Sequence, residues 1–244
     1  MESNTDLQPF NFETIKPLQL FTIIGKHDEL VKKIANKINY KNDHVVYVFT
    51  SNELYELNLE NNGKLYVLIN NPLSSNSKDE LFSNSKEDDE DDDEFYGELL
   101  DKPDSFNFVK KFYDINFDNF NFEILRFENK DTRQIFIFDN VDIKNNKSFN
   151  MYMQNHRHFG TSIIYTHDKF SSLPAIITGN VDVGIYCKLI DRKDRKELKS
   201  MEHYAFRNEL SFDVVKFLMS FDRLIVIDHR SNLSIENRLF SLQV

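Results

Sequence analysis

The sequence predicts a doubly wound α/β fold built on a mostly parallel sheet. Short apolar runs at residues 18–24, 44–50 and 133–141 are typical of strands that are buried on both faces. Between the first two runs, apolar residues recur at helical spacing from Asp28 to about Asn39, and Asp28 is a plausible N-cap. Strand, helix and strand in succession form the repeating unit of a parallel sheet.

The later elements continue this alternation. We expect a strand at residues 64–70, then a short helix followed by a strand near Phe122–Phe127, within the stretch FNFVKKFYDINFDNFNFEILRF. The remaining predicted elements are a helix at 147–155, a strand that opens with Ser-Ile-Ile at 162–164, a Pro-containing turn at 171–180, a strand at 183–190, a charged helix at 192–206, a helix at 212–220 and a strand at 223–230.

Several of these strands end in polar residues. In doubly wound sheets ligands bind at the carboxyl ends of the strands. The residues that directly follow Ile24, Phe138 and Tyr165 are therefore the first candidates for a functional site.

We expect a single domain at residues 18–244, preceded by an N-terminal extension at 1–17 and interrupted by an acidic insertion at about 72–105. The insertion carries eight consecutive acids from Glu87 to Glu94. Repulsion among them disfavours compaction and predicts a solvated, disordered segment. The alternative is a segment that mimics nucleic acid or binds a basic partner.

Composition excludes several functional classes. A formal net charge of −10 argues against a broad basic surface for nucleic acid, because phosphate binding depends on Lys and Arg. The single cysteine, Cys187, cannot form an internal disulfide and lies in an apolar run, which predicts a buried free thiol and a reducing compartment. No apolar stretch approaches the roughly 20 residues that span a bilayer, and the first residues lack the pattern of a secretory signal. We expect a soluble, intracellular protein.

The stretch FTIIGKHDELVKKI places a glycine between a strand and a helix, as a phosphate-binding loop does. A working loop of this kind requires G-x-x-x-x-G-K-[ST], in which backbone N–H groups and the lysine hold phosphate and the hydroxyl binds magnesium. Counted from Gly25, the second glycine position holds Leu30, the lysine position Val31 and the hydroxyl position Lys32. No other frame restores the motif. Lys26 could reach a phosphate, although a lone lysine after a strand is mostly a surface charge.

The strand that ends in Asp139 supplies the second half of such a site. An aspartate at the end of an apolar strand can coordinate magnesium directly or through water, although such residues also cap helices. The next position commonly holds a second acid that polarises water, and here it is Asn140, which cannot act as a base.

The segment from Arg133 to Leu189 resembles the core of viral genome-packaging ATPases of the FtsK/HerA P-loop superfamily, especially the poxvirus-type enzymes of large DNA viruses. The upstream stretches LFTIIG and HVVYVFT resemble the Walker A strand and the strand after its helix. The resemblance implies a P-loop NTPase fold with an ASCE-like core, ATP and magnesium as ligands, and a role in DNA packaging. It includes the Walker B aspartate Asp139, the pair Arg157 and His158 at a helix end, Ser162 to Ile164, Pro174 in a turn and Asn180 before a strand.

The departures from this family fall on its catalytic positions. The phosphate-binding loop is lost, and Asn140 replaces the second Walker B acid. Asp168 stands where a polar Gln is expected, Thr178 where an Arg commonly lies, and His156 where a glycine precedes the Arg-His pair. This pattern favours a chain that kept the fold and lost the reaction. We expect a degenerate nucleotide site at Gly25, Lys26, Asp139, Asn140 and Asp168.

Three functions remain open at this level. The first is a catalytically inactive homologue that acts as a structural or regulatory subunit of a virion packaging or assembly complex and needs no cofactor. The second is a divergent, active DNA-translocating ATPase that uses ATP and magnesium, with Asp139 as the metal ligand and a lysine supplied from elsewhere. The third is a non-catalytic nucleic-acid-binding module, which the net charge disfavours.

The resemblance also implies partners and a location. We expect proteins of a viral packaging or assembly complex, including an active ATPase paralogue, in the viral factory of the host cytoplasm or in the virion. Family membership suggests ring oligomers, whereas a site without nucleotide could leave a monomer or a dimer. Two further patterns could mark a ligand site. His156, His158 and His167 could bind zinc together with Asp168, but surface histidines at a helix end are the favoured reading. The charged run DRKDRKELK could contact phosphate, but a solvated helix face is favoured.

Overall fold

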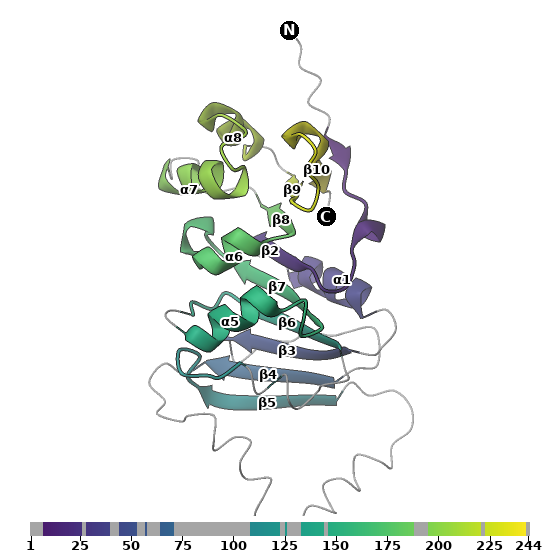
Figure 1. Cartoon of the computed structure of the whole chain (residues 1–244), viewed down its shortest axis with the longest axis vertical. Helices are drawn as coiled ribbons and strands as arrows, with labels where there is room; N and C mark the ends of the chain where they lie inside the picture. The colour runs from purple at the N-terminus through teal and green to yellow at the C-terminus, as the bar shows by residue number, and fades with distance from the viewer. Residues whose placement is uncertain are drawn as a thin grey trace, which may run out of the picture.

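The computed structural model describes residues 7–25, 28–39, 44–52, 57, 64–70, 108–122, 125, 133–143, 146–187, 195–220 and 223–242. Within these ranges one ten-stranded sheet runs through the molecule in the order β1-β10-β9-β8-β2-β7-β6-β3-β4-β5 (Figure 1). The strands are β1 (Gln8–Pro9), β2 (Leu20–Ile24), β3 (His44–Thr50), β4 (Lys64–Asn70), β5 (Phe108–Ile115), β6 (Arg133–Asp139), β7 (Thr161–His167), β8 (Val183–Tyr186), β9 (Leu224–Asp228) and β10 (Leu239–Leu242). The helices are α1 (Asp28–Ile38), α5 (Lys147–Asn155), α6 (Ala175–Asn180), α7 (Arg195–Ser200) and α8 (Phe212–Leu218).

The strands from β8 to β5 along this order are all parallel, and only β9 and β10 introduce antiparallel pairs. β2 does not pair with the next strand in sequence but lies between β7 and β8. β7 therefore separates β2 from β6, and the carboxyl ends of β2, β7, β6 and β3 meet at one edge of the sheet. The predicted mostly parallel, doubly wound sheet is confirmed.

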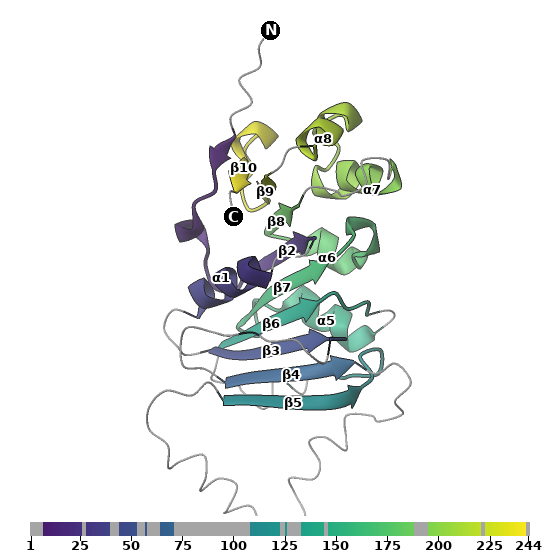
Figure 2. The ribbon, with the colours of Figure 1, turned by 180° about the vertical axis from the view of Figure 1, so that it is seen from behind.

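Helices cover both faces of this sheet. Figures 1 and 2 show α5 and α6 on one face and α1 on the other. Alternate strand residues enter the two cores accordingly: Val46 and Val48 pack in the cluster that contains α1, whereas Tyr47 and Phe49 pack in the cluster beneath α5. Every residue of β2 and β3 is buried, because each strand is covered twice.

Most predicted elements have the expected type and place, including α1, β3, β4, β6, α5 and β9. The prediction for residues 106–127 is wrong in both parts. Residues 108–115 form strand β5 instead of a short helix, and Phe122 lies in a turn while Leu125 is helical. Phe117, Phe120 and Phe122 all enter the aromatic cluster beneath α5, so tertiary packing decides the backbone path there.

Three smaller corrections concern helix α6 and strands β10 and β1. The predicted turn at 171–180 contains helix α6, which begins directly after its N-cap residue Pro174. Strand β10 was not predicted. Strand β1 adds residues of the N-terminal extension to the sheet by pairing with β10, and Phe10 beside it is buried.

The described residues bear only partly on two sequence-based expectations, the acidic insertion and the absence of a membrane span. The acidic insertion at about 72–105 lies outside the described residues. Among the helices that the structure describes, none is long and apolar enough to cross a membrane.

Candidate nucleotide-site remnant

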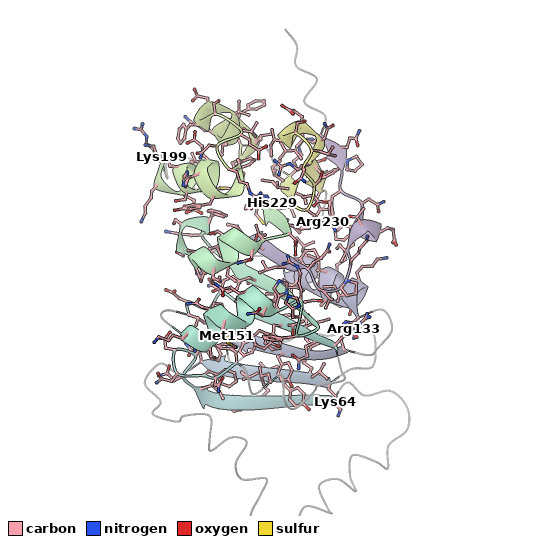
Figure 3. All side chains as sticks on the ribbon, in the orientation of Figure 1. Lys64, Arg133, Met151, Lys199, His229 and Arg230 are labelled. Atoms are coloured by element: carbon pink, nitrogen blue, oxygen red, sulfur yellow. The ribbon has the colours of Figure 1, made fainter. Side chains whose placement is uncertain are left out.

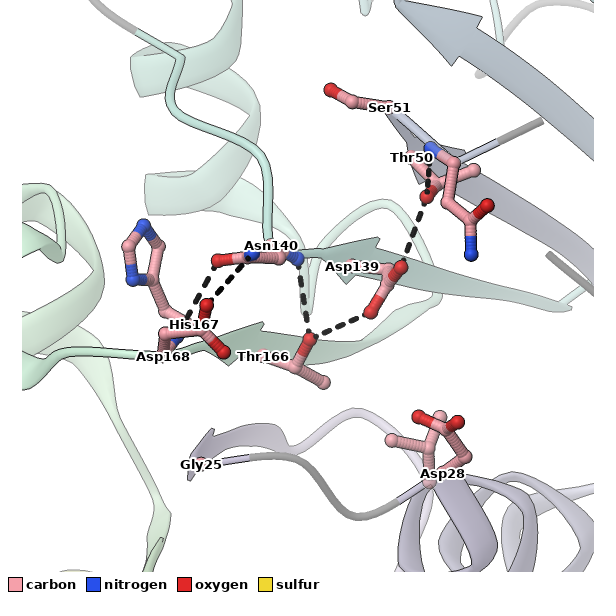
Figure 4. A pocket seen from close by; sticks show the side chains of 11 residues that line it. Gly25, Asp28, Thr50, Ser51, Asp139, Asn140, Thr166, His167 and Asp168 are labelled. Carbon is pink, nitrogen blue, oxygen red and sulfur yellow. Dashed lines mark hydrogen bonds between the residues drawn. The ribbon is translucent and has the colours of Figure 1, made fainter. Parts of the chain in front are cut away.

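A cleft of about 350 Å³ opens at the carboxyl edge of the sheet, where β2, β3, β6 and β7 end (Figure 4). The structure brings together here the positions that directly follow Ile24, Phe138 and Tyr165. The described residues that line the cleft are Gly25, Asp28, Val31, Thr50, Ser51, Asn52, Asp139, Asn140, Thr166, His167 and Asp168.

Asp139 ends β6 in the middle of the cleft. Its carboxylate accepts hydrogen bonds from the hydroxyl of Thr50, at 2.9 Å, and from the hydroxyl of Thr166, at 3.2 Å. Burial raises the pKa of this carboxyl group above its ordinary value, and the two hydroxyl donors only partly offset that effect. Asp28 and Asp168 add like charge that raises the pKa of Asp139 further.

Hydrogen bonds to Thr166 and Asp168 hold Asn140 in the cleft. Its backbone has a positive φ of 49°, and its N–H donates to the Thr166 carbonyl at 3.1 Å. The side-chain amide donates to the Asp168 carboxylate at 3.2 Å, and the Asp168 N–H donates back to the amide oxygen at 3.4 Å. Asn140 and Asp168 thus satisfy each other across the ends of β6 and β7. An amide in this position has no basic atom that could accept a proton from water.

Gly25 makes the turn that leaves β2. Its φ of +105° is a backbone conformation that side chains disfavour, and its N–H donates to the His167 carbonyl at 2.9 Å. A Cβ on Gly25 would lie 2.7 Å from the Cβ of Cys187. Glycine is therefore required here by the fold itself, whether or not a phosphate binds. Lys26, the candidate phosphate ligand, lies outside the described residues.

Helix α1 begins where a phosphate-binding loop would deliver its lysine. Leu30 and Val31, which hold the second-glycine and lysine positions of the motif, are buried on the core face of α1. The first turn of α1 instead carries the acids Asp28 and Glu29, of which Asp28 lines the cleft. An acid in the first turn interacts favourably with the partial positive charge of the helix N-terminus, which would otherwise attract a phosphate.

The charge of the cleft follows from these residues. Among the described lining residues, Asp28, Asp139 and Asp168 carry carboxylates and none is a lysine or arginine. Burial lowers the pKa of His167, so its ring is neutral at pH 7, and its Nδ1 accepts the Lys169 N–H at 3.1 Å. The described part of the cleft is therefore acidic.

The alternative zinc site is not formed. No group of three or more His, Cys, Asp or Glu residues in the described part of the chain could hold a metal ion. The ring of His156 is buried, and its Nδ1 lies 2.9 Å from the Thr161 carbonyl. His158 is exposed, and His167 lies at the cleft.

Apart from Asp139, the residues that carry the family resemblance lie outside the cleft lining. Arg157 follows α5 and forms a two-pronged ion pair with Asp182, at 2.7 Å to each carboxylate oxygen. Asp182 also accepts the Leu20 N–H at 2.8 Å, so it joins the start of β2 to the segment before β8. Pro174 precedes α6, and Asn180 ends α6 with its amide bonded to the Ile176 carbonyl at 2.7 Å. Thr178, also in α6, donates its hydroxyl to the Ala175 carbonyl at 3.1 Å.

Sequence reasoning missed part of the cleft. Thr50 ends β3, and Ser51 and Asn52 follow it. The signal was available, since a polar Thr-Ser-Asn sequence lies at the end of a strand that was predicted correctly. What the sequence did not show is that β3 lies next to β6, which places the Thr50 hydroxyl on Asp139.

The sheet order, with β7 between the strand that precedes the glycine turn and the strand that ends in Asp139, defines a P-loop NTPase-type fold of the kind found in viral genome-packaging ATPases. No protein-family model and no curated protein sequence matches the chain. Among solved structures, the genome-packaging NTPase B204 from Sulfolobus turreted icosahedral virus 2, in complex with ATP-gammaS, is similar with a TM-score of 0.54 at 13% identity, over 92% of this chain and 96% of that one.

A second similar structure is a DNA-packaging ATPase. The DNA-packaging ATPase B204 from Sulfolobus turreted icosahedral virus gives a TM-score of 0.51 at 13% identity and covers 93% of this chain and 98% of its own. At such identities the likeness establishes the fold.

Proposed function

We propose that this chain is a catalytically inactive relative of viral DNA-packaging ATPases and acts as a structural or regulatory subunit in genome packaging or virion assembly. The observation that carries the proposal is the acidic cleft. At the position where the family resemblance puts nucleotide, the described lining residues present three carboxylates and no lysine or arginine. A nucleoside triphosphate carries several negative charges, so this lining repels the ligand that an active site attracts.

Three further features support the loss of activity. Val31 replaces the lysine that would reach the terminal phosphates. Because Val31 is packed into the core, a small movement of α1 cannot bring a cationic side chain into its place. Asn140 replaces the acid that polarises water and is held by Asp168. Asp139, the candidate magnesium ligand, uses both carboxylate oxygens to accept hydroxyl hydrogen bonds.

The proposal explains why Asp139 persists without a reaction. Its carboxylate connects the hydroxyls of Thr50 and Thr166, which come from the strands on either side of β6. The same residue that would hold magnesium in an active relative here joins three strand ends. A subunit of this kind would act through its surface, and proteins of the packaging complex, including an active ATPase paralogue, are the partners we propose.

Nucleotide binding tests the proposal. The purified full-length protein is titrated with ATP and magnesium in a calorimeter, and its thermal unfolding is followed with and without millimolar ATP. We expect no heat of binding and no rise in Tm, because the cleft offers phosphate no cation among the described residues. If binding is seen, Asp139→Ala is compared with Asp213→Ala, which removes a carboxylate from the exposed surface of α8 and serves as the control.

The opposite outcome is equally specific. Magnesium-dependent binding followed by ATP hydrolysis that Asp139→Ala abolishes, and Asp213→Ala leaves intact, would refute the proposal. It would establish the divergent DNA-translocating ATPase and direct attention to Lys26 as the source of the missing charge. Salt-dependent DNA binding without any nucleotide binding would instead favour the nucleic-acid-binding module.

A further inference from the structure

The helix that follows β8 presents a basic face. Helix α7 continues into a π-helical turn, Met201–Ala205, so that residues 195–205 form one continuous helical segment. Positions 195, 199 and 203 are four residues apart and therefore lie along one side of it. This side, here named the α7 basic face, forms a shallow depression lined by Arg195, Lys196, Lys199, Ser200, His203 and Tyr204.

The acids of the same segment do not neutralise this face. Glu197 is only 2% exposed and points inward, where its carboxylate accepts the backbone N–H groups of Phe170 and Ser171. Glu202 does not line the depression. Asp191 and Asp194, the other acids of the run DRKDRKELK, lie outside the described residues. Among the described residues, Glu197 therefore does not offset the charge of the bases on this face, because it packs into the interior.

The cations of the α7 basic face are available for binding. Arg195, Lys196 and Lys199 are exposed, and no ion pair joins any of them to a described residue. Figure 3 shows Lys199 pointing away from the body of the molecule. Tyr204 is 50% exposed beside them and packs edge-on against the ring of His203, at 4.5 Å between centroids. Unpaired cations next to an exposed aromatic ring are suited to a polyanion.

The chain itself contains a matching polyanion. The eight acids from Glu87 to Glu94 supply most of the net charge of −10. The run is connected to the fold by residues 71–86 after β4 and by residues 95–107 before β5. These connections have maximum reaches of about 50 Å and 40 Å at roughly 3.3 Å per residue.

The sheet sets a lateral part of the distance that the run has to cover. Six strand-to-strand steps separate β5 from β8, the strand before α7, which at about 4.8 Å each amounts to roughly 29 Å. Figures 1 and 2 both show α7 and β5 toward opposite ends of the molecule. The maximum reach of each connection exceeds this lateral distance.

We propose that the α7 basic face binds the acidic run Glu87–Glu94 of the same chain. Tethering gives the run a local concentration of roughly millimolar order, so weak ion pairs suffice for occupancy. Nucleic acid has no such advantage, and it must approach a chain of net charge −10. The bound run would make the face selective, since another polyanion must displace it.

Competition for the face tests this proposal in the full-length protein. The probe is a fluorescent peptide of residues 85–96, whose binding is followed by anisotropy at about 0.15 M salt, where only charges within roughly 8 Å still interact strongly. A run-neutralised protein, with the acids of residues 87–94 replaced by Asn and Gln, should bind the peptide at least ten-fold more tightly than the wild type. Adding Lys196→Glu with Lys199→Glu to that protein should abolish the gain.

A matched control separates a specific face from general charge. Lys64→Glu with Lys147→Glu, in the same run-neutralised protein, changes the net charge equally at exposed sites, and Figure 3 places Lys64 far from Lys199. We expect it to retain peptide binding. Unchanged melting temperatures, and the milder pair Lys196→Gln with Lys199→Gln, guard against misfolded variants.

Several outcomes would overturn the inference. Equal peptide affinity of the wild type and the run-neutralised protein would mean that the run does not occupy the face. Equal losses in the control would mean that the binding is non-specific. A run-neutralised protein that ignores the peptide but binds duplex DNA through Lys196 and Lys199 would make the face a nucleic-acid surface. Wild-type dimers that dissociate when the run is neutralised would place the contact between chains instead.

Discussion

The hydroxyl of Thr50 donates a 2.9 Å hydrogen bond to the carboxylate of Asp139, its register partner across the β3–β6 pair. Thr166 donates to the other carboxylate oxygen from β7 on the opposite side. Asp139 thus has a structural role that requires no ligand. Its protonation should therefore be measurable in the stability of the fold.

We expect Asp139→Asn to stabilise the protein at neutral pH by up to about 1 kcal/mol, the size of a typical net hydrogen-bond term. Burial raises the pKa of Asp139 in the fold, so the folded state prefers the protonated carboxyl group. The wild type therefore loses stability as pH rises from the unfolded-state value near 3.8 through the raised pKa of the folded state. The neutral amide avoids this loss and keeps the shape.

Urea unfolding at pH 7 and at pH 3 measures the effect. The two proteins should differ at pH 7 and converge at pH 3, where the carboxyl group is protonated in both states. A variant that is less stable at pH 7 would show that the ionised carboxylate is the preferred form and that the hydroxyl donors outweigh burial.

A second prediction concerns the ion pair of Arg157 and Asp182. Asp182→Ala should lower the free energy of unfolding by about 1–3 kcal/mol, because it leaves the Leu20 N–H without its acceptor inside the fold. Arg157→Ala should cost less than about 1 kcal/mol, because the Arg157 side chain is 46% exposed and its ion pair is solvated.

Asp182→Asn is the matched variant for this pair. Its side-chain oxygen can still accept the Leu20 N–H while the charge is lost, so we expect a cost close to that of Arg157→Ala. Urea denaturation of the single and double variants gives the coupling between them. A cost for Asp182→Asn as large as that for Asp182→Ala would assign the stability to the ion pair instead.

The third prediction is a loss of stability in mild acid. Burial lowers the pKa of His229 to about 3, and the neighbouring cations Arg207 and Arg238 lower it further than Asp228 can raise it. Burial also lowers the pKa of His156. A histidine held neutral in the fold gains a proton on unfolding below about pH 6.5, so stability is full above that pH and falls as pH drops toward the folded-state pKa.

Each such group can contribute a slope of up to about 1.4 kcal/mol per pH unit. We expect the free energy of unfolding to fall between pH 7 and pH 5.5, and His229→Leu to make that fall shallower. His158→Gln, at an exposed position, should leave the slope unchanged. Identical slopes for the wild type and His229→Leu would mean that His229 is protonated in the folded protein as well.

The sequence by itself determined the parallel sheet and the edge at which to look for a site. Apolar runs such as residues 44–50 and the amphipathic pattern of α1 are local signals, and their spacing identifies strand and helix without long-range information. The residues at the motif positions also showed that the second glycine and the lysine of a phosphate-binding loop are missing after Gly25. The sequence also identified Asp139 as a strand-end acid.

Only the tertiary structure decided which strand ends meet. The placement of β3 beside β6 brings Thr50 to Asp139, and a hydrogen bond across 89 residues has no local sequence signal. The burial of the Glu197 side chain was equally unpredictable, because its carboxylate accepts the backbone N–H groups of Phe170 and Ser171 on another element. Burial and charge balance depend on which face of a helix packs inward, and that is decided by neighbours distant in the sequence.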